Sequence, residues 1–227
     1  MRLFYAVFNK KVTAYNSNIK TTGTKMKILI IGASGTIGNQ VVKALATAHE
    51  VIKANHSSGD VQIDITKTAS IHSVFESIGK VDAIVCAAGD IAFNAFSELS
   101  REEWDVGINS RLMGQVNLTQ IGSKYLNDGG SITLTSGIIA DYPIAYGASA
   151  ATLNGAIQHF AKAVSIELPN NIRINVVSPT VVTESLDTYG DYFPGFNSIN
   201  AEDLAKYYVR SVLGVETGQT FKAFAGN

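Results

Sequence analysis

A glycine-rich turn between an apolar run and a run of helical period constrains the fold of this chain most strongly. The stretch reads KILIIGASGTIGNQVVKAL from residue 27 to residue 45 and contains Gly32, Gly35 and Gly38. Residues without a Cβ atom allow a strand to turn sharply into a helix whose N-terminus binds a pyrophosphate. The pattern is not G-x-G-x-x-G, because Ser34 and Ile37 stand where that pattern needs glycine. Alternatively, the glycines could only form a turn between two elements without binding a ligand, but the preceding strand favours phosphate binding.

The chain of 227 residues is long enough for one domain with a full hydrophobic core. From Met26 onward, short apolar runs alternate with amphipathic ones, a pattern typical of an α/β fold. We expect a three-layer, doubly wound parallel sheet of the Rossmann-like kind in a single domain, residues 26–227. The expected strands are 27–31, 50–54, 61–63, 83–86, 131–135, 173–177 and 220–224, and the expected helices are 37–47, 69–78, 109–126, 148–167 and 201–212.

Residues 1–25 show neither helical nor strand period and contain five basic residues and no acidic one. We interpret them as an N-terminal extension, disordered or artefactual, with an alternative start at Met26. A basic arm that contacts a partner is the other interpretation. Without these five charges the remaining chain is acidic overall, so nucleic acid is not an expected partner.

The chain has one cysteine, Cys86, and four scattered histidines. One cysteine excludes an internal disulfide and a cysteine-based zinc site, and we expect no metal. We expect Cys86 to be a buried packing residue without a catalytic role. No apolar run approaches the ~20 residues that cross a bilayer, so we expect no membrane segment and, by default, a cytoplasmic location.

Several motifs follow the glycine turn in the order found in short-chain dehydrogenases/reductases. They are Cys86-Ala87-Ala88-Gly89, Asn109, Ser136, Tyr146 and the run IRINVVSP from Ile172 to Pro179. The chain resembles this family over nearly everything after Met26. The resemblance implies an NAD(P)-binding oxidoreductase that acts on a small carbonyl or alcohol substrate and forms a homodimer or homotetramer.

The resemblance also implies roles for three side chains. Tyr146 would exchange a proton with the substrate oxygen, the Ser136 hydroxyl would hold that oxygen, and Asn109 would hold a proton-relay water. A positioned proton donor contributes ~10²- to 10⁴-fold to a rate. Only ten residues separate Ser136 from Tyr146, so the loop between them must be compact, and Thr135 is an alternative for the hydroxyl.

The main departure from the family is Ala150, where the motif Tyr-x-x-x-Lys would place a lysine one helical turn after the tyrosine. In the family that ammonium lowers the tyrosine pKa and binds the nicotinamide ribose. Without it, Tyr146 should keep a pKa near ~10 and remain a neutral proton donor, which favours carbonyl reduction. Asn154 could bind the ribose instead, or could serve only helix packing.

Cofactor choice depends on the residues after the second expected strand. This stretch contains no acid before Asp60, which favours NADP(H) over NAD(H), with His56 and Ser57 as contacts of the 2′-phosphate. An ordinary polar loop is the alternative. The other cofactor-binding residues that the resemblance implies are Gly32, Ser34, Gly35, Thr36, Ile37, Gly38, Asp64, Ala87, Ala88, Gly89 and Pro179.

Aromatic residues gather between Pro179 and Asn200, where the family places its substrate lid: Tyr189, Tyr192, Phe193 and Phe196. They could contact an apolar substrate, or cover the core or a subunit interface. The leading hypothesis is NADP(H)-dependent reduction of a small carbonyl compound. The alternative is a catalytically silent NAD(P)-binding sensor or interaction protein on the same fold. In that case the absence of a lysine at Ala150 reflects the loss of catalytic activity.

Overall fold

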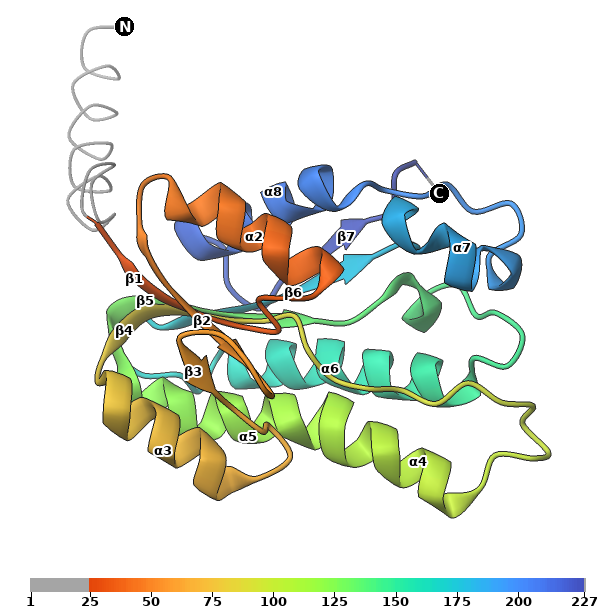
Figure 1. Ribbon diagram of the computed structural model, residues 1–227, viewed down its shortest axis with the longest axis horizontal. Helices are drawn as coiled ribbons and strands as arrows, with labels where there is room; N and C mark the ends of the chain where they lie inside the picture. Colours follow the sequence, from red (N-terminus) through yellow and green to blue (C-terminus); the bar gives the residue numbers. More distant parts are fainter. Residues whose placement is uncertain (1–24, 227) are drawn as a thin grey trace, which may run out of the picture.

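Seven parallel strands form one sheet in the computed structural model, which describes residues 25–226 (Figure 1). The predicted α/β class and the parallel, doubly wound sheet are confirmed. The predicted N-terminal extension lies outside the described residues except for Lys25. Across the sheet the strands are β3 (Val61–Gln62), β2 (Glu50–Asn55), β1 (Lys27–Ile31), β4 (Val81–Cys86), β5 (Leu126–Thr135), β6 (Arg173–Pro179) and β7 (Thr220–Ala223).

Helices cover both faces of this sheet (Figure 1). One face carries α2 (Thr36–Ala46) and α8 (Ala201–Leu213), and the other carries α3 (Thr68–Ile78), α5 (Met113–Gly122) and α6 (Ala148–Val164). The sequence did not predict α4 (Arg101–Gly107) or the short α7 (Leu186–Tyr189) that follows β6.

The predicted helix at residues 109–126 begins too late and ends too late. The helical stretch starts at α4, where Ser100 and Glu103 form a capping box, and continues through a π-helical turn, Ile108–Leu112, into α5. It ends near Tyr125, since Leu126 already belongs to β5. Apolar periodicity shows neither a capping box nor the extra residue of a π turn, which explains why the predicted start was too late.

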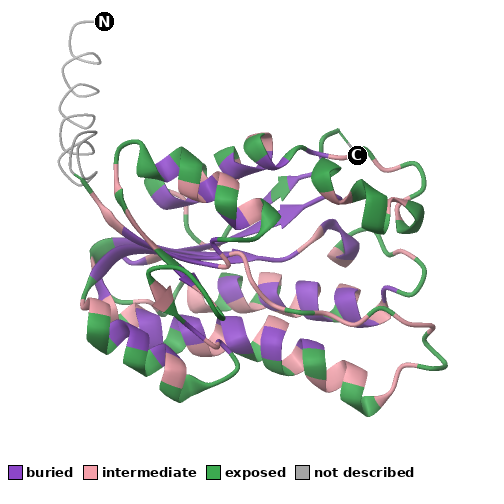
Figure 2. Ribbon diagram, in the orientation of Figure 1, coloured by how far each residue is buried: buried purple, intermediate pink, exposed green. Residues whose placement is uncertain are grey.

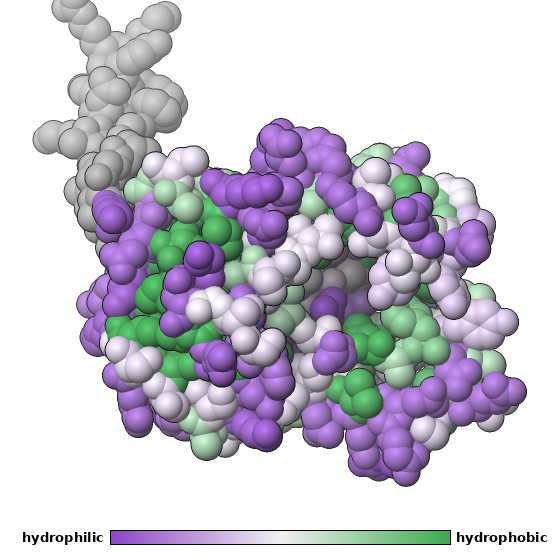
Figure 3. Space-filling model, in the orientation of Figure 1, coloured by the Kyte–Doolittle hydropathy of each residue, from purple (hydrophilic) through white to green (hydrophobic). Residues whose placement is uncertain are grey.

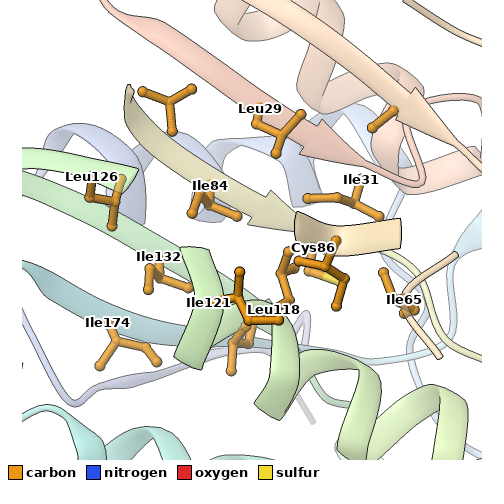
Figure 4. Close-up of a cluster of buried hydrophobic side chains, with 14 of the residues drawn as sticks. Leu29, Ile31, Ile65, Ile84, Cys86, Leu118, Ile121, Leu126, Ile132 and Ile174 are labelled. Carbon is orange, nitrogen blue, oxygen red and sulfur yellow. The ribbon is translucent and has the colours of Figure 1, made fainter. Parts of the chain in front are cut away.

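The central strands are buried on both faces, as parallel strands between two helical layers must be, whereas β2 and β3 at one edge are partly exposed (Figure 2). All six residues of β4 are buried. On one face, Leu29, Ile84 and Ile132 pack with Leu118 and Ile121 of α5 (Figure 4). On the other face, alternate strand residues pack against α2 and α8.

The order of the strands reverses between β1 and β4, which are neighbours in the sheet. In open parallel sheets such a switch point leaves a crevice at the carboxyl ends of the strands, where ligands bind. The turn at Gly32 and the segment from Ala87 to Gly89 follow these two strands directly. Within residues 25–226, no helix has the length and apolar character that crossing a membrane requires.

Candidate functional site

Two of the three glycines in the turn after β1 are required by the protein's own packing. Gly32 has a φ of +79°, and a Cβ atom there would lie 2.5 Å from the backbone oxygen of Ala87. A Cβ atom at Gly38 would lie 2.0 Å from the backbone oxygen of Gly32. The end of β1, the segment after β4 and the first turn of α2 therefore meet backbone to backbone.

Gly35 differs, because a Cβ atom there would meet no protein atom closer than 3.4 Å, an ordinary contact. Gly35 is the N-cap of α2, no side chain caps the first turn, and this turn contains no acidic residue. The backbone N–H groups and the positive end of the helix dipole are thus available to an anion. Gly35 also lines a hollow, so the absence of its side chain leaves room for a phosphate.

The hollow beside this turn has a volume of about 600 Å³, and we call it the outer hollow. It brings together eight of the predicted cofactor residues: Gly32, Ser34, Gly35, His56, Asp64, Ala87, Ala88 and Gly89. Thr36, Ile37 and Gly38 form the first turn of α2, and Ser57 does not line the hollow. Asn55, Asp90 and Ser110, for which the sequence predicted no role, line it as well.

Asn55, the last residue of β2, fixes one wall of the outer hollow. Its Oδ1 accepts hydrogen bonds from the backbone N–H of Ser34 at 2.9 Å and from the Ser34 hydroxyl at 3.1 Å. Position 55 carries no carboxylate, and the exposed side chain of His56 lies 4.0 Å from the carboxylate of Asp64. Asp64 lines the same hollow, and a hydrogen bond from the Thr66 hydroxyl lowers the pKa of its carboxyl group.

A second hollow of about 360 Å³, the inner hollow, continues from the outer one. Gly89 and Asp90 line both, so the two form one groove along the carboxyl ends of the strands. Figure 3 shows the surface hollowed in the right half of this face, with apolar side chains at its lower margin. Ser136 and Pro179, both predicted site residues, line the inner hollow.

Ser136 follows β5 directly and is 1% exposed. Its backbone N–H donates to the oxygen of Val177 at 2.9 Å, and its hydroxyl accepts a hydrogen bond from Nε2 of Gln158 at 3.2 Å. The neighbouring Thr135 hydroxyl instead donates to the oxygen of Cys86 at 2.6 Å and lies 2.8 Å from the Tyr208 hydroxyl. Of the two candidate hydroxyls, the one that lines the inner hollow is therefore Ser136.

Tyr146 does not share a hollow with Ser136. It lines a separate hollow together with Tyr192 and Phe196, and its ring meets that of Tyr192 edge to face at 6.3 Å. Its side chain is 53% exposed, and its φ of +61° lies in the left-handed region that tyrosine rarely adopts. The structure thus does not bring the predicted proton donor to the predicted oxygen-holding group.

The π turn presents residues other than the predicted one to the groove. Asn109 is exposed and lines neither hollow, whereas Ser110 lines the outer hollow and Arg111 lines the inner one. Arg111 donates hydrogen bonds to the backbone oxygen of Ser136 at 2.9 Å, to that of Gly89 at 3.3 Å and to Oδ1 of Asn154 at 3.4 Å. Burial lowers the pKa of its guanidinium, which still remains charged at neutral pH.

Two residues of α6 complete the inner wall. Ala150 and Asn154 lie one helical turn apart, and both line the inner hollow. Asn154 is buried and contacts Arg111, so one face of α6 and the π turn meet inside the groove.

Tyr189 and Phe193 from the predicted lid also line the inner hollow, where they face Phe93 from the loop after β4. The rings of Phe93 and Tyr189 lie 6.4 Å apart. The other two lid aromatics, Tyr192 and Phe196, line the hollow of Tyr146 instead. The lid segment thus contributes to both hollows.

Comparisons with known proteins place these features in context. The family model described as "Enoyl-(Acyl carrier protein) reductase" matches residues 23–217. The crystal structure of the protein lin1944 from Listeria innocua is 48% identical, with a TM-score of 0.86 over 88% of this chain and 100% of that chain. A small-chain dehydrogenase in complex with NADPH is 25% identical, with a TM-score of 0.81 over 89% of this chain and 98% of that chain. L-xylulose reductase of Homo sapiens is 25% identical over 88% of this chain and 95% of its own length.

Proposed function

This chain belongs to the short-chain dehydrogenase/reductase family and is an oxidoreductase of that type, and from this premise we propose that it uses NADPH to reduce a small carbonyl compound to an alcohol. One observation carries the proposal. The outer and inner hollows form a single groove that leads from the glycine turn to Ser136. An extended dinucleotide bound at the turn would therefore reach the serine hydroxyl.

The preference for NADPH is supported by the end of β2. An acidic side chain at this place would bind the ribose 2′-hydroxyl and repel a 2′-phosphate, and Asn55 is neutral. The side chain of His56 is exposed at this end of the groove, where it lies 4.0 Å from the Asp64 carboxylate and would also contact the phosphate. The structural relative with bound NADPH supports the same choice.

A nicotinamide cofactor, when bound in the groove, would supply the hydride for the carbonyl carbon. The Ser136 hydroxyl holds the substrate oxygen, where negative charge develops, and a hydrogen bond at this point stabilises the transition state. Apolar groups from Ile91, Ile138 and Phe193 line the same hollow and would exclude water. A hollow of about 360 Å³ suits a small substrate.

Tyr146 is the proton donor in this proposal, a role that requires its side chain to turn toward Ser136. The present backbone conformation supports such a change, because a left-handed φ costs a residue like tyrosine roughly 1–2 kcal/mol. A return to the extended region would remove this strain and redirect the side chain. Tyr189 is the other tyrosine that could donate, since it already lines the inner hollow.

Matched phenylalanine variants test this assignment. We expect Tyr146→Phe to lower turnover in NADPH-dependent reduction of a carbonyl panel by at least ~10²-fold, as loss of a general acid does. Tyr189→Phe should remain within about tenfold of the wild type. The reverse result would transfer the donor role to Tyr189.

A second candidate function, cofactor binding without catalysis, is favoured by the separation of Tyr146 from Ser136. In that case the protein would bind NADPH, no carbonyl compound would be reduced, and Tyr146→Phe would leave any binding-dependent function intact. The same assays distinguish it from the first.

We also propose that the protein is cytoplasmic and forms an even-numbered homo-oligomer, as the family resemblance implies. Its interface would involve α5 and α6. Light scattering of the full chain tests the oligomeric state, and a monomer would contradict it.

A further inference from the structure

Arg111 is the only basic residue that lines the inner hollow. Its three hydrogen-bond acceptors, on Gly89, Ser136 and Asn154, are neutral oxygens. Within residues 25–226 the arginine makes no ion pair, although Asp90 in the same hollow acts on it electrostatically, and its Nε is buried without a hydrogen-bond partner. A positive charge held in this way stabilises negative charge that enters or develops in the hollow.

The guanidinium lies next to the helix face that lacks the motif lysine. It contacts Asn154, which is one turn after Ala150 on α6, and all three residues line the inner hollow. Its bond to the backbone of Ser136 places it beside the hydroxyl that would hold the substrate oxygen.

The surrounding backbone is shaped to this arginine. Gly89 has a φ of +123°, and a Cβ atom there would lie 2.9 Å from the Cα of Arg111. The π turn moves Asn109 to the exposed side and Arg111 into the groove. Turns of this kind occur frequently at functional sites.

A lysine at position 150 and an arginine at position 111 would place two like charges in one partly buried hollow. Such a pair is unfavourable, because each charge disfavours the other and little water is present to screen them. Ala150 leaves the space to the guanidinium.

We propose that Arg111 carries the positive charge of this active site, from the π turn, in place of the lysine that position 150 lacks. The inference rests on the proposed reductase function. As the new C–H bond forms, the carbonyl π bond breaks, its electron pair moves to the oxygen beside Ser136, and a tyrosine proton neutralises that oxygen. The two electrons come from NADPH, which leaves as NADP⁺. Arg111 stabilises the charge on the oxygen and, unlike a lysine, relays no proton.

A double-mutant cycle tests the placement without any assay of activity. The variants are Arg111→Gln, Ala150→Lys and the double variant, and their thermal unfolding is measured without cofactor. We expect Ala150→Lys to lower the midpoint by roughly 4 °C or more when Arg111 is present, and by less than half as much beside glutamine. Arg210→Gln, which removes an exposed arginine paired with Glu216, is the control for loss of charge.

Steady-state kinetics with NADPH and a carbonyl compound that the wild-type protein reduces test the role of the charge. We expect Arg111→Gln to lower kcat by at least ~30-fold, with the NADPH Kd changed less than about threefold. The double variant, with its lysine at position 150, should recover at least about tenfold of that loss. Arg210→Gln should match the wild type.

The lysine variant Arg111→Lys adds a signature that a packing role would not give. It should keep most of kcat at pH 6.5 and lose it as the pH rises, because a buried ammonium has a lowered pKa and becomes neutral. The groups that act electrostatically on position 111 are Cys86, Asp90 and Tyr208. Burial raises the pKa of both Cys86 and Tyr208, and both stay neutral in this range. The wild-type guanidinium should show no such loss.

The proposal is overturned if the midpoint shifts of the two single variants add up to the shift of the double variant. It is also overturned if Arg111→Gln has the kcat of the wild type. If the wild-type protein reduces no carbonyl compound, the proposed function itself fails. The unfolding cycle then still decides whether Arg111 occupies the place of the lysine: a non-additive cycle supports this placement, and an additive one contradicts it.

Discussion

Nε2 of Gln158 donates a hydrogen bond to the hydroxyl oxygen of Ser136 at 3.2 Å. Gln158 lies two turns after Ala150 on α6 and also reaches the hydroxyl of Ser178 at 3.4 Å. Because the Ser136 oxygen accepts this bond, its own hydrogen is free to donate to a substrate oxygen. The helix that lacks the motif lysine thus still orients the serine.

This relationship predicts graded effects on reduction. Ser136→Ala should lower kcat about 10²-fold, because it removes a donor to the developing charge. Gln158→Leu should lower kcat about fivefold while Ser136 remains, since one orienting hydrogen bond is worth ~1 kcal/mol. Steady-state kinetics measure both. A larger loss in the glutamine variant than in the serine variant would contradict the assigned order of roles.

The glycine turn predicts opposite behaviour for two alanine variants. Gly35→Ala should keep the unfolding midpoint within about 2 °C and weaken NADPH binding at least tenfold, since the new Cβ atom meets ligand space. Gly38→Ala should lower the midpoint, since its Cβ atom would overlap the backbone oxygen of Gly32. Calorimetry for binding and thermal unfolding for stability separate the two effects.

The sheet was predictable from the sequence because its central strands contain continuous apolar runs, and the glycine turn marks the switch point. The bounds were less accurate. Leu126 begins β5, but the polar residues Asn127 and Asp128 and two glycines interrupt the apolar pattern there. Helix α4 has an exposed, acidic first turn, and only the capping box of Ser100 and Glu103 could have revealed it.

The lining of the outer hollow was more predictable than that of the inner hollow. Most residues predicted to bind the cofactor follow strand ends, which the sheet brings to one edge. A π turn decides which side chains near Asn109 face the groove, and the hydrophobic period of the sequence does not show the one extra residue in that turn. Arg111 was detectable only as an isolated basic residue in an otherwise uncharged segment. The orientation of Tyr146 follows from a backbone angle that residue type does not predict.

Cys86 is predicted to be chemically inert in the folded protein, because burial raises the pKa of its thiol to about 11. At pH 8, thiol reagents should label it only after unfolding. The unfolded thiol, with a pKa of ~8.5, loses its proton before the folded one does. Stability from this group should therefore be complete below about pH 8.5 and decrease as the pH rises toward 11. Urea unfolding of the wild type and Cys86→Ala measures this, and equal pH dependence in both would contradict it.

The central claim is that the groove binds NADPH beside a neutral Asn55. The most direct test is calorimetric titration of the full chain with NADPH and, separately, with NADH, repeated with Asn55→Asp. The variant keeps an oxygen that can accept the Ser34 hydrogen bonds and places an acid at the last position of β2. We expect micromolar binding of NADPH, at least about tenfold tighter than NADH, and a reversal of this preference in the variant. Binding of neither dinucleotide to the wild-type protein would contradict the account.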